Sequence, residues 1–269
     1  MTRAIGRNDR ILVLSPHLDD AILSLGGSIA SWTDAGAVVT ALTVFTAEGD
    51  DSALRSKIVK KMHKLWNLGE HPYATRRIED IAALEVVGAN YIHGNLLDCI
   101  YRQTENGKSL YPSEASVYSA APASAETIYG PLKELIIGCL DTINPTLVLS
   151  PMGIGRHVDH FITSEVFREI SHGAEYDVAL YEEIPYATGK YPMINPDNVQ
   201  AAKDRSAWGI RSSRLVEIDF ERKRRAIECY SSQLVDIFPD GFGVLEDYMS
   251  TLNGEHAVER IWQADTNSN

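Results

Sequence analysis

Cysteine is scarce in this sequence, and its three occurrences follow no pattern. Cys99, Cys139 and Cys229 are odd in number and lie far apart along the 269 residues. This usage excludes a disulfide framework and a cysteine-based zinc site. It is typical of a reducing compartment, so we expect a cytoplasmic protein.

Positive charge is also in short supply. Lys and Arg total 25 against 37 Asp and Glu, which leaves a formal net charge of -12 at pH 7. Proteins that bind nucleic acids usually present a basic face, so this balance argues against a nucleic-acid partner. An acidic surface is compatible with an amine-bearing substrate, although it more often serves solubility alone.

Long apolar runs are missing as well. The apolar residues 11–14 are followed within a few positions by Asp19 and Asp20. This run is too short for the apolar part of a signal peptide or for a membrane span, so we predict neither. The composition, 44% hydrophobic and 23% charged, is ordinary for a globular protein with a sizeable core.

Short apolar runs alternate with helical patterns along most of the chain. The expected strands are residues 11–14, 38–45, 89–93, 147–149, 177–181 and 215–218. The expected helices are residues 20–36, 52–68, 76–87, 126–141, 157–170 and 220–233. This alternation predicts an α/β fold, a doubly wound (Rossmann-like), mostly parallel sheet with helices on both faces. The Gly-x-Gly-x-x-Gly spacing is absent, which argues against a dinucleotide-binding protein.

No repeat, low-complexity block or linker divides the chain, so we predict a single domain over residues 1–269. Its core is expected at about residues 11–233. Two irregular stretches, residues 94–125 and 182–213, are predicted to be insertions over the carboxyl edge of the sheet, because long irregular segments in compact domains are usually functional. Residues 264–269 are expected to form a disordered tail.

Three groups that can bind a metal or transfer a proton follow the first expected strand. His17, Asp19 and Asp20 lie where a buried strand ends and a helix begins, which is the edge at which open α/β sheets bind ligands. A tight turn would let His17 and Asp20 converge on one cation and leave Asp19 free to handle protons. Taken alone, the cluster is explained equally well by an aspartate that caps the helix.

A second cluster of the same kind follows a later buried strand. His157, Asp159 and His160 come after a turn and begin the next helix. Two strand ends of one parallel sheet place both clusters over the same edge, so His160 would complete a ligand set with His17 and Asp20. Two histidines and one carboxylate with an open position form a known catalytic metal pattern, which suits zinc and admits iron or cobalt. Purely structural histidines remain the alternative.

The two clusters resemble the signature motifs of a known family. His17-Leu18-Asp19-Asp20 and His157-Val158-Asp159-His160 are similar to those of the LmbE-like, or PIG-L, family of zinc-dependent de-N-acetylases. Residues 76–79 look like the family's Arg-x-x-Glu helix, and residues 223–233 look like its C-terminal pattern, which ends in Tyr-x-Ser-Gln. The resemblance spans about residues 11–233.

The resemblance implies a zinc-dependent hydrolase that removes an acetyl group from an N-acetylated amino sugar or a related small-molecule conjugate. The implied zinc ligands are His17, Asp20 and His160, and the implied catalytic groups are Asp19, His157 and Asp159. Asp19 would be the general base. A protonated His157 would assist, and Asp159 would orient it and keep its pKa above the ordinary value of about 6.5.

Substrate contacts are expected from Arg76 and Asp98. The alternative for Arg76 is an ion pair with Glu79 or Asp80 on its own helix.

Three departures from the family pattern stand out. The usual proline is Leu18 and the usual glutamate is Ala21, and neither is a ligand or the base. Some members carry a tyrosine where this chain has Gly155, so any tyrosine contact must come from elsewhere, for example from Tyr101 or Tyr186.

Two other functions compete with deacetylation of a sugar. One is a metal-dependent amidase that acts on a larger amide conjugate, of the thiol-conjugate amidase type. The other is a metal-binding protein without catalysis, and the presence of Asp19 and His157 argues against it because metal binding alone needs neither. The expected partner is a small N-acetylated substrate. Edges and insertions of such folds often support homo-oligomers, which would make a second copy of the chain a further partner.

Overall fold

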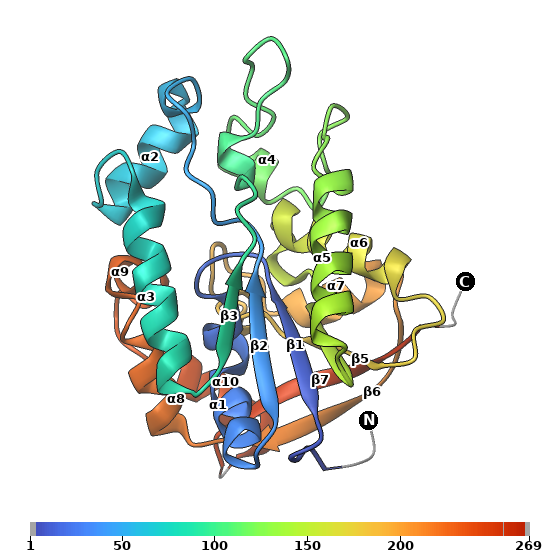
Figure 1. Ribbon diagram of the computed structural model, residues 1–269. Coiled ribbons are helices and arrows are strands. Elements are labelled where there is room, and N and C mark those ends of the chain that lie inside the picture. Colours follow the sequence, from blue (N-terminus) through green and yellow to red (C-terminus); the bar gives the residue numbers. More distant parts are fainter. Residues whose placement is uncertain (1–3, 255, 267–269) are drawn as a thin grey trace.

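Seven strands form one sheet within residues 4–254 and 256–266, the part of the chain that the computed structural model describes. Their order is β3-β2-β1-β4-β5-β7-β6 (Figure 1). The strands are β1 (Arg10–Ser15), β2 (Val38–Thr43), β3 (Asn90–His93), β4 (Leu147–Pro151), β5 (Asp177–Tyr181), β6 (Gly209–Glu217) and β7 (Val258–Asp265). The first five pair in parallel, and β7 is antiparallel to both β5 and β6. The predicted α/β, mostly parallel class is confirmed.

Helices cover both faces of this sheet. They are α1 (Asp20–Asp34), α2 (Lys57–Trp66), α3 (Pro72–Val86), α4 (Glu114–Val117), α5 (Tyr129–Ile143), α6 (Val158–Ile170), α7 (Asn198–Arg205), α8 (Phe220–Ile227), α9 (Ser231–Ile237) and α10 (Gly243–Asn253). Helix α1 packs against α3 and α8 on one face, and α5 packs against α6 on the other (Figure 1). None of these described helices is long and apolar enough to cross a membrane.

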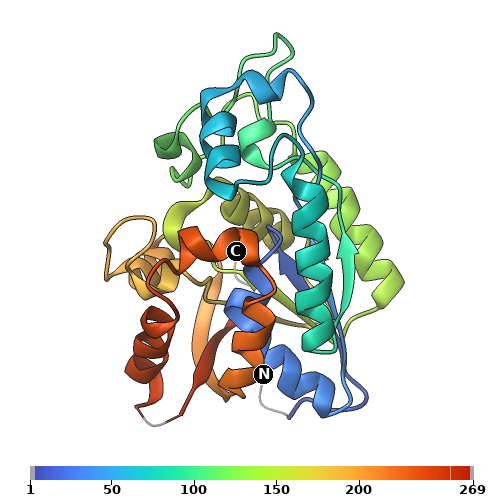
Figure 2. The ribbon, with the colours of Figure 1, turned by 90° about the vertical axis from the view of Figure 1, so that its left-hand side faces the viewer.

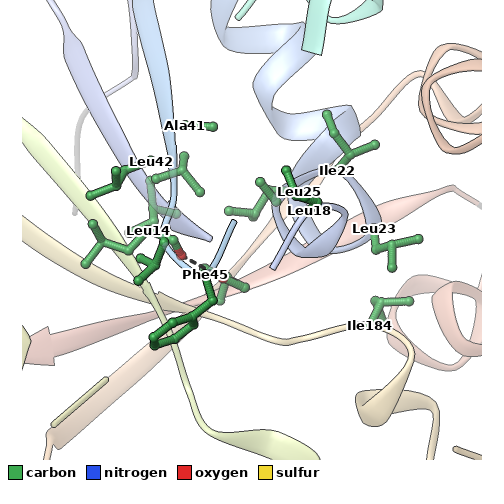
Figure 3. Packing of buried hydrophobic residues seen from close by; sticks show 14 of the residues in the cluster. Leu14, Leu18, Ile22, Leu23, Leu25, Ala41, Leu42, Phe45 and Ile184 are labelled. Carbon is green, nitrogen blue, oxygen red and sulfur yellow. Dashed lines mark hydrogen bonds between the residues drawn. The ribbon is translucent and has the colours of Figure 1, made fainter. Parts of the chain in front are cut away.

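Strand β1 is the centre of the core. Its residues Ile11 to Leu14 have no exposed surface, and it pairs with β2 on one side and β4 on the other. A parallel strand that is covered on both faces needs such a continuous apolar run. Figure 3 shows Leu14 and Leu42 of the sheet in one buried cluster with Leu18 and Leu25 of the turn and helix that follow β1.

Helix α2 and the segment around α4 lie beyond the carboxyl ends of β1, β2 and β3 (Figures 1 and 2). The same end carries the loops that follow β1 and β4. The fold therefore collects its irregular segments at the edge where both histidine clusters emerge.

The expected helix over residues 220–233 is two helices, α8 and α9. Tyr230, between them, leaves the helical conformation and buries its ring, and its hydroxyl donates to Asp80 Oδ1 at 2.7 Å. The turn at Tyr230 thus provides a hydrogen bond to the buried carboxylate of Asp80 in α3. The amphipathic pattern over residues 220–233 does not show this break, because the residue that contacts Tyr230, Asp80, lies on a helix far away in the sequence.

The C-terminal region contains more regular structure than expected. The stretch over residues 182–213 holds α7 and the first part of β6. Helix α10 and strand β7 follow residue 233, where no element is predicted. The expected tail is wrong at its start, because Ala264 and Asp265 belong to β7, and residues 267–269 lie outside the described part of the chain.

A buried ion pair fastens β7 to the first helix. Lys223 of α8 and Glu259 of β7 are 1% and 5% exposed, and Nζ lies 2.6 Å from Oε1. Glu259 also accepts hydrogen bonds from the backbone N–H groups of Gly27 and Ser28 in α1, at 3.0 and 2.7 Å. Buried charges need such partners, since an unpaired one is costly in the interior. The pair therefore holds α1, α8 and β7 in one arrangement.

Gly27 permits the close approach that this arrangement needs. A Cβ added there would lie 2.5 Å from Ile218 Cβ. We expect Gly27→Ala to lower the free energy of unfolding by about 1–3 kcal/mol, since overpacking forces side chains or backbone to shift. In the control Gly138→Ala, on α5, the new Cβ meets nothing within 4 Å. The control should be neutral or slightly stabilising in urea denaturation; equal losses in both variants would contradict the steric explanation.

Candidate metal centre

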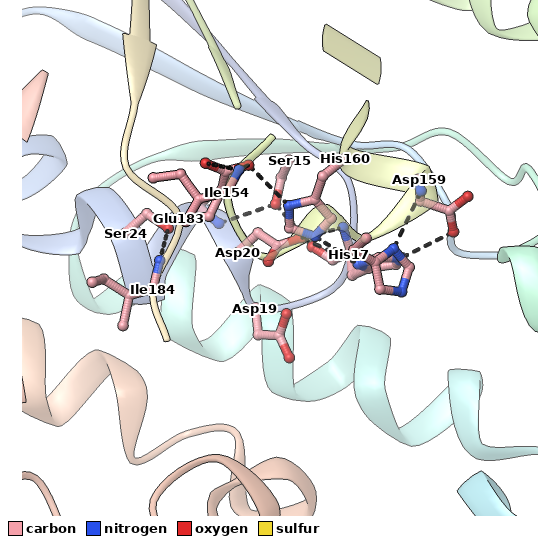
Figure 4. Close-up of polar contacts among 12 residues, drawn as sticks. Ser15, His17, Asp19, Asp20, Ser24, Ile154, Asp159, His160, Glu183 and Ile184 are labelled. Carbon is pink, nitrogen blue, oxygen red and sulfur yellow. Dashed lines mark hydrogen bonds and ion pairs between the residues drawn. The ribbon is translucent and has the colours of Figure 1, made fainter. Parts of the chain in front are cut away.

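The two histidine clusters meet where the winding of the sheet reverses. Strands β2 and β3 follow β1 on one side, whereas β4 and β5 lie on its other side. In doubly wound sheets this reversal leaves a crevice at the carboxyl ends of the two central strands. His17 follows β1 and His160 lies in the first turn of α6, after β4, and Figure 4 shows the two rings side by side.

The turn after β1 is shaped by its own side chains. Ser15 Oγ donates to the carbonyl of His17 at 2.8 Å and accepts the N–H of Ala21 at 3.0 Å. Asp20 Oδ2 accepts the N–H of His17 at 2.8 Å. Asp19 occupies the N-cap position of α1 but makes no capping bond with its side chain. The capping explanation of this cluster is therefore wrong.

Three donor atoms converge at this turn. Asp20 Oδ2 lies 3.3 Å from His17 Nδ1 and 3.2 Å from His160 Nε2, and the two ring nitrogens lie 3.3 Å apart. A tetrahedral ion with bonds of about 2.0–2.1 Å requires donors separated by roughly 3.3 Å. The set predicted from the sequence thus fits a small divalent cation and leaves one position open.

His157 is a weaker candidate for this ligand set. One of its ring nitrogens lies within 4.8 Å of donor atoms of His17 and His160. However, its Nδ1 already accepts the backbone N–H of Asp159 at 3.2 Å, so Nε2 carries the proton in the neutral ring. Asp20 is closer to the other two donors, and its Oδ2, although it accepts the N–H of His17, has a further lone pair for a metal.

A buried carboxylate stands behind His160. Glu183 Oε1 lies 3.3 Å from His160 Nδ1. The same oxygen accepts the N–H of Gly153 at 2.7 Å, and Glu183 has no exposed surface. A carboxylate on the far nitrogen of a histidine fixes its tautomer and turns the other nitrogen toward the metal. The sequence analysis missed Glu183, although it is the second residue after β5, the next parallel strand of this edge.

Asp159 orients the ring of His17 in the same way as Glu183 orients that of His160. Its Oδ2 lies 3.1 Å from His17 Nε2, and it also binds the guanidinium of Arg102 and the N–H of Cys99. The expectation that its carboxylate orients His157 is therefore wrong. Arg102, 5% exposed, was also missed by the sequence analysis, because no local pattern marks it.

The expected charge of His157 is likewise wrong. Burial and the neighbouring charge of His17 lower the pKa of His157 to about 3, and the opposing effect of Asp159 is too small to reverse this. The ring also packs edge-on against Tyr118, with centroids 5.3 Å apart. His157 is therefore a neutral hydrogen-bond donor at ordinary pH.

Asp19 lies apart from the three donors, as Figure 4 shows, and is 7% exposed. Its Oδ2 is 3.4 Å from Arg76 Nη2. Burial and the charge of Asp20 raise the pKa of Asp19 to about 7, and Arg76 opposes this rise. A carboxyl with such a pKa can accept and return protons near neutral pH.

Arg76 points toward this carboxylate and not along its own helix. Glu79 instead accepts hydrogen bonds from Ser231 and Ser232, and Asp80 is bound by Tyr230, so the alternative pairing within the helix is wrong. The Arg76 guanidinium lies over the ring of Trp66 at 4.7 Å, and its Nε is buried without a partner in the described residues.

A cavity of about 760 Å³ opens beside these groups. It is lined by Asp19, His157, Arg76 and Asp98, together with residues of both expected insertions. Asp98 accepts the hydroxyl of Tyr73 at 2.7 Å.

Tyr186 fills the space that a side chain at position 155 would take. A Cβ on Gly155 would lie 2.3 Å from its ring. Tyr186 lines the cavity, whereas the Tyr101 hydroxyl is bound to His63 at 2.6 Å.

Residues 12–171 match the profile of a family described as GlcNAc-PI de-N-acetylase, or PIG-L. The chain belongs to the PIG-L family. The resemblance seen in the two histidine motifs is thereby confirmed.

Several PIG-L relatives are deacetylases. The 2'-N-acetylparomamine deacetylase of Streptomyces fradiae is 26% identical over 239 residues, which cover 86% of this chain and 75% of that protein. A solved deacetylase of the teicoplanin biosynthesis pathway is 29% identical with a TM-score of 0.79, over 95% of this chain and 98% of that one. The zinc-inhibited form of teicoplanin deacetylase is 28% identical with a TM-score of 0.76 over the same shares.

Glu183→Gln should weaken divalent metal binding by about 10–100-fold, because a carboxylate that orients a ligand typically has an effect of this size. Glu182→Gln is the matched control. Glu182 is the adjacent residue and is also buried, but it binds Arg260 and Trp262 away from the site. Competition with a fluorescent chelator gives both affinities. An unchanged affinity in Glu183→Gln would remove Glu183 from the metal centre.

Metal binding should release at least one proton. Burial disfavours the charged ring of His160, but Asp20 beside it raises the pKa of His160 to about 9. Below that pH the metal must displace the proton, so the affinity should rise with pH up to at least about pH 9. Calorimetric titrations in buffers of different ionisation enthalpy count the released protons, and no dependence on the buffer would contradict the proposed ligand.

Proposed function

We propose that this chain is a metal-dependent hydrolase that removes the acetyl group from an N-acetylated amino sugar or a related small-molecule conjugate. One observation carries the proposal: three donors lie at the spacing of a tetrahedral ion, and two of them, His17 and Asp20, line a cavity that is also lined by Asp19, which is free of the ligand set. The deacetylases of acetylparomamine and of teicoplanin biosynthesis support the same reaction in this family.

We assign His17, Asp20 and His160 as the metal ligands and Zn²⁺ as the ion. Two imidazole nitrogens and one carboxylate oxygen suit tetrahedral zinc, and Fe²⁺ or Co²⁺ are the nearest alternatives. A divalent ion in such a site polarises a carbonyl oxygen and makes a water acidic near neutral pH.

Asp19 accepts the proton of the attacking water. The water oxygen bonds to the amide carbonyl carbon, the C–N bond breaks, and the proton passes from Asp19 to the leaving nitrogen, so the products are acetate and a free amine. A pKa near 7 suits both transfers, because the carboxylate must take the proton and then give it up. Arg76 holds the carboxylate in place through its contact at 3.4 Å.

His157 and Tyr186 donate hydrogen bonds to the carbonyl oxygen as it gains negative charge. Both line the cavity. His157 is neutral and presents Nε2–H, and burial raises the pKa of Tyr186, which keeps its hydroxyl protonated. Asp159 is in this scheme a positioning residue that acts through His17.

Arg76 and Asp98 hold the polar part of the substrate. The unpartnered Nε of Arg76 is a donor and the Asp98 carboxylate is an acceptor, and a sugar hydroxyl can use either.

The cysteines are free in the described chain, and Cys99 and Cys139 are buried, which supports a cytoplasmic location.

Asp19→Asn should bind metal as the natural chain does but lower kcat by about 10²–10⁴-fold, since that is the usual contribution of a general base. His160→Ala is the companion variant and should lose the metal. Elemental analysis and an assay for free amine on acetylated sugars separate the two effects. Near-normal turnover by metal-loaded Asp19→Asn would refute its role.

A panel of substrates tests the function itself. Release of acetate from acetylated amino sugars by the metal-loaded natural chain is the expected outcome. Cleavage confined to larger amide conjugates would instead favour the amidase alternative.

A further inference from the structure

A buried arginine that the proposed mechanism does not use stands behind the metal centre. Arg102 is 5% exposed, and a guanidinium is charged at any ordinary pH. It belongs to residues 94–125, the first of the two expected insertions. Its Nη2 donates to Oδ1 of Asp159, whose side chain has no exposed surface. Because a buried charge is costly unless it is paired, each of the two groups depends on the other.

Asp159 joins Arg102 to a proposed metal ligand. Its Oδ2 lies 3.1 Å from His17 Nε2 (Figure 4), and the same oxygen accepts the N–H of Cys99 at 3.0 Å. The two oxygens of one carboxylate move together, so a donor that holds Oδ1 also sets the direction in which Oδ2 faces the His17 ring. That direction decides how His17 Nδ1 points toward the other donors of the metal centre.

The guanidinium is itself held from its far side. Its Cζ lies over the rings of Phe45 and Tyr111, 5.2 and 5.3 Å from their centroids. Glu126 Oε2 lies 3.3 Å from Arg102 Nε and accepts the hydroxyl of Tyr111 at 2.8 Å. The other oxygen of Glu126 accepts two backbone N–H groups just before α5. Arg102 therefore has little freedom to follow a carboxylate that moves.

The turn that carries Arg102 is folded around the same carboxylate. Residues Cys99–Tyr101 form a 3-10 turn, which Asp98 caps with its side chain. This turn brings the N–H of its first residue and the side chain of Arg102 to Asp159 together. The beginning of the insertion is thus attached to the metal centre and does not merely pass over it.

We infer that Arg102 is a positioning residue of the metal centre. By holding Asp159 it keeps the ring of His17 in the direction that metal binding needs, and it thereby couples the insertion to the metal. Arg102 does not line the cavity, so it acts on the reaction only through these two residues. The inference rests on the metal site of the proposed function.

The substitution Arg102→Lys tests this role, because it keeps the charge and changes the geometry. Lysine Nζ would lie at about the position of arginine Cζ, one bond short of Asp159, so the carboxylate would have to turn toward it and away from His17. We expect the affinity for Zn²⁺ to fall by about three- to tenfold, less than the roughly 10–100-fold typical of a carboxylate that contacts a ligand directly. Competition with a fluorescent chelator measures this affinity, and an unchanged value would overturn the inference.

Arg260→Lys is the matched control. Arg260 Nε also binds a buried carboxylate, that of Glu182 at 2.6 Å, and its Cζ lies 5.1 Å from the ring centroid of Trp262. Glu182 binds none of the proposed ligands within the described chain, so the affinity of this variant for Zn²⁺ should equal that of the natural chain. Urea denaturation of the metal-free proteins shows whether each variant is folded.

A double-mutant cycle with Asp159→Asn shows through which residue Arg102 acts. In the Asp159→Asn background, Arg102→Lys should leave the affinity for Zn²⁺ unchanged, because the carboxylate that the lysine would displace is gone. Interaction of this kind is what a cycle measures. Equal losses in both backgrounds would mean that the lysine disturbs the fold in general, and would overturn the inference.

Hydrogen exchange on the natural chain tests the coupling without any substitution. If the turn supports metal binding, bound metal must support the turn, since coupling between two sites is reciprocal. Zn²⁺ should therefore slow amide exchange over residues 99–110 by at least about threefold, and it should leave α10, residues 243–253, unchanged. Exchange over residues 99–110 that does not respond to Zn²⁺ would overturn the coupling.

None of these measurements needs a substrate, so they separate the inference from the proposed function. A chain that binds Zn²⁺ and loses affinity in Arg102→Lys but hydrolyses no acetylated compound would keep the inference and reject the deacetylase. Deacetylation by a natural chain whose affinity for Zn²⁺ is the same in Arg102→Lys would do the reverse. A natural chain that binds no divalent metal would overturn both.

Discussion

The pairing of β1 with β4 is the contact on which the site depends. The ladder from Ile11↔Leu147 to Val13↔Leu149 places side by side two strands that are more than 130 residues apart in sequence. Because the chain winds away from this pair in opposite directions, no crossover helix covers the carboxyl ends of both strands. Each strand end then delivers one turn and one histidine cluster to the same crevice.

Around that crevice the interior holds more negative than positive charge. Asp19, Asp20, Asp98, Asp159 and Glu183 are all buried there, against Arg76, Arg102 and the rings of His17 and His160, whose pKa values are raised. Each carboxylate has a partner, yet the balance favours a bound cation, because charges in a poorly solvated site are stable only when they are compensated. The donor set, the carboxylates behind the two proposed ligand histidines and the cationic side chains are in this sense one electrostatic unit.

The sequence correctly predicted the features of the fold that depend on short residue patterns. The apolar run of β1 and the motifs at His17 and His157 predicted the sheet class and the meeting of the two clusters. The sequence did not show that Asp159 faces His17 and not its neighbour His157, because adjacency along a helix start says little about side-chain direction. Glu183 and Arg102 were missed for a related reason: their roles exist only through contacts with distant segments. The late strand β7 was missed because it lacks a continuous apolar run and pairs with β5, which lies far earlier in the sequence.

The ring of Tyr186 occupies the space that a side chain on Gly155 would need. One volume beside the metal centre can be filled by a tyrosine from either position but not from both, since the distance from the ring to a Cβ at 155 would be 2.3 Å. Gly155 also has a φ of 75°, which disfavours any other residue. Moving the tyrosine from one position to the other during evolution therefore requires a change at both residues. A change at only one of them would leave either two rings competing for the same space or no ring there. The residues at positions 155 and 186 are therefore expected to vary together across related chains.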